Sequence, residues 1–261
     1  MAAPEPRVII KATNISQQFK AGDEIIQPLK NATFELLESS FNVIYGPSGS
    51  GKSTLLNILT GLQKPTNGTV TFDDREVYEL EPDELAFFRA TRLGIVYQSN
   101  YWVKSLSAVE NVSLPLYFLG YSRARAAEVA LFALEQVKMQ DYAKKYPVLL
   151  SGGEQQRIAM ARAIASSPLF IIADEPTGSL DSTNGDMIMN LLYEAQTKNS
   201  RTIIMVTHNM EYLPLADRLL HIEDGEVQQL QHESIQETTN DLLQKMEARI
   251  ARLAASKSKK T

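Results

Sequence analysis

Gly46-Pro47-Ser48-Gly49-Ser50-Gly51-Lys52-Ser53-Thr54 dominates any interpretation of this 261-residue chain. The apolar run 41–45 before it predicts a short buried strand, and residues 55–59 after it predict an amphipathic helix. A glycine-rich turn between a strand and a helix aims backbone N–H groups and the positive end of the helix dipole at one point. Because every position of the pattern is filled, it predicts a loop that binds nucleotide phosphates rather than a plain turn.

Charged and polar side chains suited to a nucleotide lie in this loop and after a later strand. Lys52 supplies a full positive charge, and the Ser53 hydroxyl is placed to hold Mg²⁺. Asp174 and Glu175 follow the apolar run 169–173, where carboxylates are costly unless a cation or a reaction uses them. We expect Ser53 and Asp174 to hold magnesium and Glu175 to polarise the water that hydrolyses a nucleoside triphosphate.

Three further residues have more than one interpretation from the sequence. His208 ends the apolar run 201–207, where it would sense or stabilise a terminal phosphate. Gln98 ends the predicted strand 95–97 and would face a ligand crevice, although a glutamine alone says little. Phe19 lies in a polar segment, where an exposed aromatic ring either stacks on a base or covers the edge of a sheet.

A second glycine-rich helix start occurs at Ser151-Gly152-Gly153-Glu154. Ser151 and Glu154 have capping-box spacing, so one interpretation is that these residues only begin a helix. Two consecutive glycines nevertheless cost backbone entropy, and they indicate a place where another chain or a phosphate approaches closely.

The order of patterns along the chain predicts an α/β fold. It comprises a mainly parallel core sheet, an N-terminal antiparallel β subdomain from strands 8–13 and 32–37, and an inserted α-helical subdomain at about 99–167. We expect one domain over 1–229 and a helical tail with a basic end over 230–261. The tail helix either packs on its own domain or docks a partner.

The composition excludes several classes of function. Lys and Arg number 26 against 31 Asp and Glu, and the net charge of −5 argues against nucleic acid as a partner. The absence of cysteine fits a reducing compartment and excludes thiolate metal sites and cysteine nucleophiles. Residues 1–7 lack the layout of a signal peptide, and no apolar run reaches the ~20 residues that span a bilayer. If the protein functions at a membrane, it would therefore do so through a partner protein.

Together these motifs resemble, in their order, the P-loop cassettes of the ATP-binding-cassette (ABC) ATPases over about residues 8–229. The double-glycine helix start is the most specific of them, because other phosphate-loop enzymes lack it. The resemblance identifies 46–54 as the Walker A loop, Gln98 as the Q-loop glutamine, 150–157 as the family signature, 169–175 as Walker B, 179–181 as the D-loop and His208 as the switch histidine.

The resemblance implies a magnesium-dependent ATPase with ATP and Mg²⁺ as cofactors. It makes Glu175, His208, Gln98 and Lys52 catalytic and adds Gln98 to Ser53 and Asp174 as a metal ligand. The nucleotide contacts that it implies come from Phe19, the adenine-stacking aromatic, and from Gly46, Pro47, Ser48, Gly49, Ser50, Gly51, Lys52, Ser53, Thr54, Gln98, Ser151, Gly152, Gly153 and Asp181.

The resemblance also implies partners. Two cassettes would face each other head to tail around two ATP molecules, with Ser151 and Gly152 acting on the other copy's γ-phosphate. The helical subdomain and the segment after Gln98, including Tyr101 and Trp102, would contact an integral membrane permease. The protein would then lie peripherally on the cytoplasmic face of the membrane.

Within the family, residues 173–181 and 109–116 look most like the lipoprotein-release, macrolide-export and cell-division group. Asn209 stands where an acid commonly follows the switch histidine, and 98–106 is idiosyncratic. We predict a subunit that drives conformational change in a separate permease. The alternative is an ATP-driven transmission module that regulates an extracytoplasmic activity without moving solute. A soluble cassette acting on DNA or ribosomes would carry a coiled-coil insert or a second cassette, which this sequence lacks.

Overall fold

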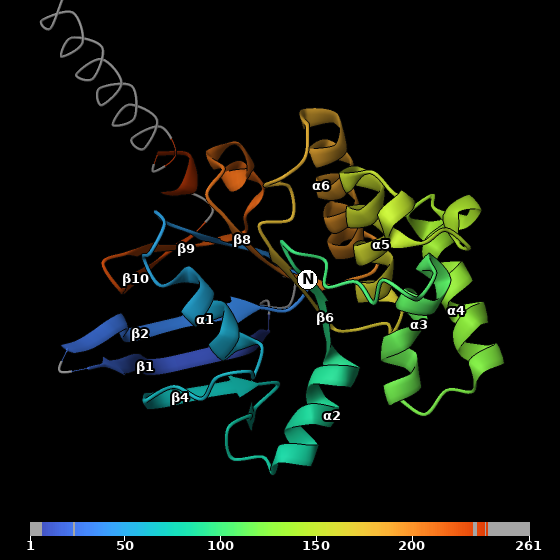
Figure 1. Ribbon diagram of the computed structural model, residues 1–261. Coiled ribbons are helices and arrows are strands. Elements are labelled where there is room, and N and C mark those ends of the chain that lie inside the picture. Colours follow the sequence, from blue (N-terminus) through green and yellow to red (C-terminus); the bar gives the residue numbers. More distant parts are fainter. Residues whose placement is uncertain (1–6, 23, 232–233, 238, 240–261) are drawn as a thin grey trace, which may run out of the picture.

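An antiparallel sheet is formed by strands from the N-terminal part of the chain. The computed structural model describes residues 7–22, 24–231, 234–237 and 239, and Figure 1 shows two sheets beside a group of helices. The antiparallel sheet has the strand order β2-β1-β4-β5. Its strands are β1 (Val8–Ala21), β2 (Glu24–Leu37), β4 (Asn67–Phe72) and β5 (Arg75–Glu76). This confirms the predicted antiparallel β subdomain, with β1 and β2 longer than expected.

The core sheet has the order β10-β9-β3-β8-β7-β6. Its strands are β3 (Phe41–Tyr45), β6 (Leu93–Val96), β7 (Phe170–Asp174), β8 (Thr202–Thr207), β9 (Arg218–Glu223) and β10 (Glu226–Gln231). Every pairing is parallel except the β9–β10 hairpin, which confirms a mainly parallel core. Because parallel strands end on one edge, the residues that follow β3, β7 and β8 gather there.

Helices cover the core sheet and extend beyond it (Figure 1). Three of them pack on one another beside the sheet, as expected for the inserted helical subdomain: α3 (Ala108–Phe118), α4 (Arg123–Gln136) and α5 (Gly152–Ile164). The others are α1 (Lys52–Leu59), α2 (Pro82–Arg92) and α6 (Ser182–Thr197), with 3₁₀ turns η1 (Gln140–Tyr142), η2 (Pro147–Leu149) and η3 (Met210–Leu215).

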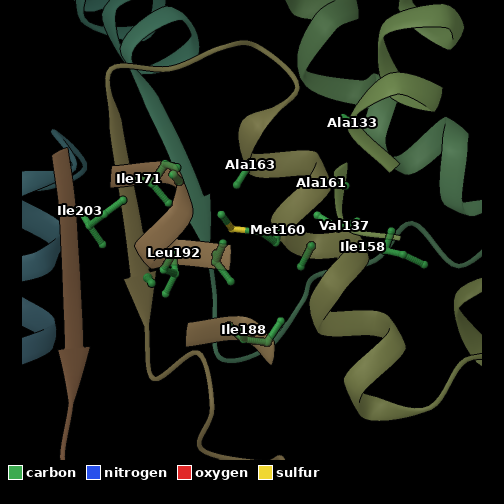
Figure 2. Close-up of a cluster of buried hydrophobic side chains, with 14 of the residues drawn as sticks. Ala133, Val137, Ile158, Met160, Ala161, Ala163, Ile171, Ile188, Leu192 and Ile203 are labelled. Carbon is green, nitrogen blue, oxygen red and sulfur yellow. The ribbon is translucent and has the colours of Figure 1, made fainter. Parts of the chain in front are cut away.

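A buried apolar cluster fixes α5 and α6 against β7 (Figure 2). Met160 of α5 lies on the side of this cluster next to Ile171 of β7 and Leu192 of α6, and these side chains are at most 2% exposed. Burying a side chain of this size stabilises the fold by about 1.5–3 kcal/mol. The helix that begins at Gly152 is therefore held rigidly behind the strand that carries Asp174.

The end of the expected domain falls inside a strand, because β10 continues to Gln231. Of the tail predicted over 230–261, residues 240–261 lie outside the described part of the chain. Within the tail, Ile235 is buried in the core cluster that also contains Leu219. Across the part of the chain that the structure describes, no helix is long and apolar enough to cross a bilayer.

Candidate active site

The phosphate-binding loop joins β3 to α1 and needs its glycines. Gly51 precedes the first residue of α1 with φ 110°, and a Cβ there would lie 2.2 Å from the carbonyl oxygen of Pro28. Gly49 also has a left-handed backbone, with φ 79°. Inside the loop, the buried Ser50 hydroxyl has no hydrogen-bond partner among the described residues. A buried donor without a partner suits a loop that receives phosphate oxygens.

Lys52 carries its charge to the same loop. Its Nζ donates to the carbonyl oxygens of Gly46 and Pro47, each at 2.8 Å. Partial burial lowers the pKa of Lys52, and the negative charges of Glu175 and Asp174 oppose that shift. The ammonium group and the two carboxylates are therefore electrostatically coupled, which makes them one site.

Asp174 ends β7 with its carboxylate half-buried. Burial raises the pKa of Asp174, the adjacent charge of Glu175 raises it further, and Lys52 lowers it. Two neighbouring carboxylates carry more negative charge than one lysine can neutralise. A divalent cation would supply the missing positive charge. Ser53, in the first turn of α1, offers the hydroxyl oxygen that Mg²⁺ accepts as a ligand. The residues present thus fit a magnesium ion held by Ser53 and Asp174.

Glu175 and His208 are in direct contact. The His208 Nδ1 lies 2.8 Å from the Glu175 Oε1, with 13% of the Glu175 side chain exposed and 67% of the His208 side chain exposed. Glu175 has a left-handed backbone with φ 46°, which costs a residue other than glycine about 1–3 kcal/mol. Such strain is typical of residues whose aim matters for function.

A cavity of about 870 Å³ opens beside this pair. Glu175, Gly178 and His208 contribute to its wall. A Cβ built on Gly178 would lie 3.7 Å from the Glu175 Cβ and 3.8 Å from the Gln98 Nε2, so the Gln98 amide reaches the same site. The structure therefore places Lys52, Gln98, Asp174, Glu175 and His208 in one region, and their catalytic roles stay a prediction.

The remaining sequence-predicted residues lie elsewhere in this single chain. Phe19 is on β1, 43% exposed, in the antiparallel sheet. Ser151 and Gly152 begin α5, which Figure 1 shows well apart from α1. None of these three residues lines the cavity. A site that uses Ser151 with the phosphate loop would need a second chain.

The two glycines after Ser151 differ in their surroundings. A Cβ on Gly153 would lie 2.3 Å from the Asn184 Oδ1, so packing inside the chain already explains that glycine. A Cβ on Gly152 would meet only Leu180, at 3.8 Å. Gly153 thus has a packing reason inside the chain as well, Gly152 is open to an approaching group, and the expectation that both glycines mark an external approach stays a prediction.

Asp181 is the N-cap of α6 and bonds with Asn184, a residue to which the sequence alone assigned no role. The carboxylate of Asp181 accepts hydrogen bonds from the Asn184 backbone N–H at 2.9 Å and from its Nδ2 at 2.8 Å. These bonds hold the Asn184 side chain against Gly153, which ties the D-loop to the start of α5. An aspartate three residues before an asparagine at a helix start was the available signal.

A strand, a glycine-rich loop and a helix with a lysine opposite two carboxylates define a nucleotide hydrolase of the phosphate-loop class. Comparison with known proteins resolves the class further. The ABC transporter family profile matches residues 29–178, and the chain belongs to this family and is an ABC ATPase.

Individual relatives cover most of the chain. An uncharacterized ABC transporter ATP-binding protein of Methanocaldococcus jannaschii, MJ0796, is 42% identical over 84% of this chain and 95% of its own. The lipoprotein-releasing system ATP-binding protein LolD of Buchnera aphidicola is 38% identical over 84% of this chain and 96% of its own. A solved dimeric structure of MJ0796, in a post-hydrolysis state bound to ADP and Pi, matches with a TM-score of 0.80 at 40% identity, over 86% of this chain and 99% of that one.

Proposed function

We propose that this chain hydrolyses Mg-ATP with Glu175 as the residue that polarises the attacking water. The observation that carries the proposal is the Glu175–His208 contact of 2.8 Å beside Lys52 and Asp174. Lys52 and the loop N–H groups bind the β- and γ-phosphates, and His208 orients Glu175 and meets the terminal phosphate. When bound, magnesium on Ser53, Asp174 and Gln98 supplies positive charge to the phosphates. Catalysis then comes mainly from positioning and charge.

The complete site requires two copies of the chain. Ser151 and Gly152 lie outside the cavity beside Glu175, and Gly152 is open to an approaching group. The solved structure of MJ0796 is a dimer bound to ADP and Pi. In this chain, the start of α5 would contact the γ-phosphate bound by the other copy, with Asp181 near the contact and Phe19 stacked on the adenine.

The energy of ATP hydrolysis drives a conformational change in a separate integral membrane subunit. The relative LolD is named as the ATP-binding protein of a lipoprotein-releasing system, and residues 173–181 look like that group. We place the chain peripherally on the cytoplasmic face of the membrane, with the cassette over 1–229, the helical subdomain at about 99–167 and the tail over 230–261. Tyr101, 73% exposed, offers a contact surface beside the helical subdomain.

Co-purification tests this assignment. The full chain, tagged and expressed in its own cells, should bring down one integral membrane subunit from solubilised membranes, and the complex should hydrolyse ATP faster than the chain alone. Recovery of ribosomes or DNA without a membrane protein would contradict the proposal. A transport assay with the complex in vesicles then separates a transporter, which moves solute, from a transmission module, which does not.

A further inference from the structure

Arg162 of α5 lines a groove between the end of β6 and α3, outside the catalytic site. The groove has a volume of about 230 Å³, and Tyr97, Tyr101 and Pro115 contribute to its wall. Arg162 is the one charged residue among the groove's lining residues in the described part of the chain. Its place at this groove is unusual, because an arginine on a helix that packs on a core sheet commonly pairs with an acid.

The guanidinium of Arg162 has contacts, but no salt bridge to any described residue. Its Nη2 donates to the Asn100 carbonyl oxygen at 2.6 Å, and its Cζ lies 4.7 Å from the centre of the Trp102 ring. None of the carboxylates in residues 7–22 and 24–231 forms a salt bridge with it. Burial lowers the pKa of Arg162, as expected for a cation without an acidic neighbour. A half-buried cation of this kind gains most from an anion supplied by another molecule.

Two tyrosines in the groove wall determine which kind of anion the groove can accept. The rings of Tyr97 and Tyr101 pack edge to face with their centres 5.2 Å apart. Burial is the main reason why the pKa of Tyr97 is raised, so its phenol keeps its proton and remains a hydrogen-bond donor. The groove therefore offers one planar cation, the hydroxyl groups of Tyr97, Tyr101 and Ser166, and otherwise apolar walls. A phosphate, with more charge and more acceptor oxygens, would need further cations that the groove lacks.

We propose that this groove docks an Asp or Glu side chain from a cytoplasmic segment of the membrane subunit, with Arg162 as its ion-pair partner. The carboxylate matches the two parallel N–H groups of the guanidinium, and its methylene carbons fit the apolar wall. This proposal rests on the proposed function, because it names the chemistry by which the membrane subunit is recognised.

The same groove is connected to the family signature. The Trp102 ring that covers Arg162 donates its Nε1–H to the Gln155 Oε1 at 2.9 Å. The Gln155 amide in turn donates to the Leu150 carbonyl oxygen at 3.0 Å, directly before Ser151. A carboxylate that binds Arg162 would therefore be linked, through Trp102 and Gln155, to the residues that start α5.

The test uses the full chain in complex with its co-purified membrane subunit. Because removing one partner of a desolvated ion pair costs affinity, Arg162→Glu should lower the recovered membrane subunit by about tenfold or more, and Arg162→Lys by less. Tyr101→Glu, at an exposed position, should cause a comparable loss without involving the fold. Lys198→Glu, which breaks only the surface pair of Lys198 with Glu194 outside the helical subdomain, is the matched control and should stay within about twofold.

A charge swap identifies the partner group. A photo-crosslinking amino acid at position 101 should attach to a membrane-subunit peptide that contains an Asp or Glu, and changing that acid to Arg should restore binding to Arg162→Glu. Unchanged recovery with both Arg162→Glu and Tyr101→Glu, or a crosslinked peptide without an acid, would overturn the proposal. Arg162-dependent binding to vesicles of anionic phospholipid, with no such crosslink, would assign the groove to lipid instead and overturn it as well.

The failures of the two proposals are distinguishable. Melting temperature and ATP hydrolysis by the isolated variants are measured alongside recovery. If hydrolysis persists and recovery does not depend on Arg162, only the docking proposal fails. If the wild-type chain neither hydrolyses ATP nor recovers a membrane subunit, the proposed function fails first.

Discussion

The Nδ1 of His208 and the Oε1 of Glu175, 2.8 Å apart, join the ends of two neighbouring parallel strands. Glu175 extends β7 by one residue, and its N–H donates to the carbonyl oxygen of Val206 on β8 at 2.9 Å. That bond fixes the strained backbone of Glu175 while the side chain reaches His208. A preformed pair of this kind needs little rearrangement when the nucleotide arrives.

Glu175→Gln should separate binding from turnover. The amide keeps the shape of the side chain but cannot act as a base, so hydrolysis should fall by about 10²–10⁴-fold while ATP binding persists. The variant should also accumulate an ATP-bound dimer. Phosphate release and size-exclusion chromatography measure the two effects. Glu194→Gln, which removes only the surface pair with Lys198, is the control. Normal turnover in Glu175→Gln would refute the assigned role.

Asp174 should make the nucleotide-free protein less stable as pH rises. Because burial raises its pKa, the folded state binds the proton more tightly than the unfolded state does. The contribution of Asp174 to stability should therefore fall between the ordinary pKa of 3.8 and the raised value, and remain lower above it. Asp174→Asn should melt higher than the wild type at pH 7, by a margin that shrinks as the pH is lowered.

Melting curves across pH, with and without Mg-ATP, check this prediction. Mg-ATP should stabilise the wild type more than Asp174→Asn, because the variant loses a metal ligand. Asp186→Asn, at an exposed position of α6, should show neither effect. If Asp174→Asn melts below the wild type at pH 7, the charged carboxylate of Asp174 stabilises the nucleotide-free protein, and the prediction is wrong.

The sequence indicated the core of this fold because its signals there are local. The run 41–45, the glycine loop and the following helix lie within 19 residues, and continuous apolar runs marked β7 and β8. The antiparallel sheet has longer strands than the sequence predicted: β1 was expected to end at Thr13 but continues to Ala21. Asn14 has φ 51°, and register shifts follow it, so the alternation that signals a strand is broken there.

The candidate site was predictable where strand order alone places residues. Asp174, Glu175 and His208 follow adjacent parallel strands, so their proximity follows from the topology. The packing of Asn184 on Gly153 involves two helices, and no local pattern encodes it. That no acid of the described residues forms a salt bridge with Arg162 likewise depends on the assembled surroundings, because which side chains lie near it is visible only in three dimensions.

The two glycines after Ser151 should respond differently to alanine. Gly153→Ala pushes the Asn184 side chain off its hydrogen bond with Asp181, while alanine gains helix propensity, so the free energy of unfolding should fall by about 1 kcal/mol at most and the melting temperature by a few degrees. Gly152→Ala meets nothing closer than 3.8 Å and should melt like the wild type, yet impair ATP-driven dimerisation. Melting curves and size-exclusion chromatography distinguish them. Equal loss of stability in both variants would show that Gly153 is packed no more closely than Gly152.

Mixed dimers test whether Ser151 acts on the other chain. Lys52→Ala should weaken nucleotide binding by about 10–100-fold, since it removes a charged donor, and Ser151→Arg should block the approach of a second copy. Two copies of either variant alone would have both sites damaged, so neither variant should form an ATP-dependent dimer by itself. When the two are mixed, one site combines an intact Lys52 with an intact Ser151, so ATP-dependent dimerisation and some hydrolysis should return. If mixing restores neither, Ser151 and Lys52 do not share a site across the dimer.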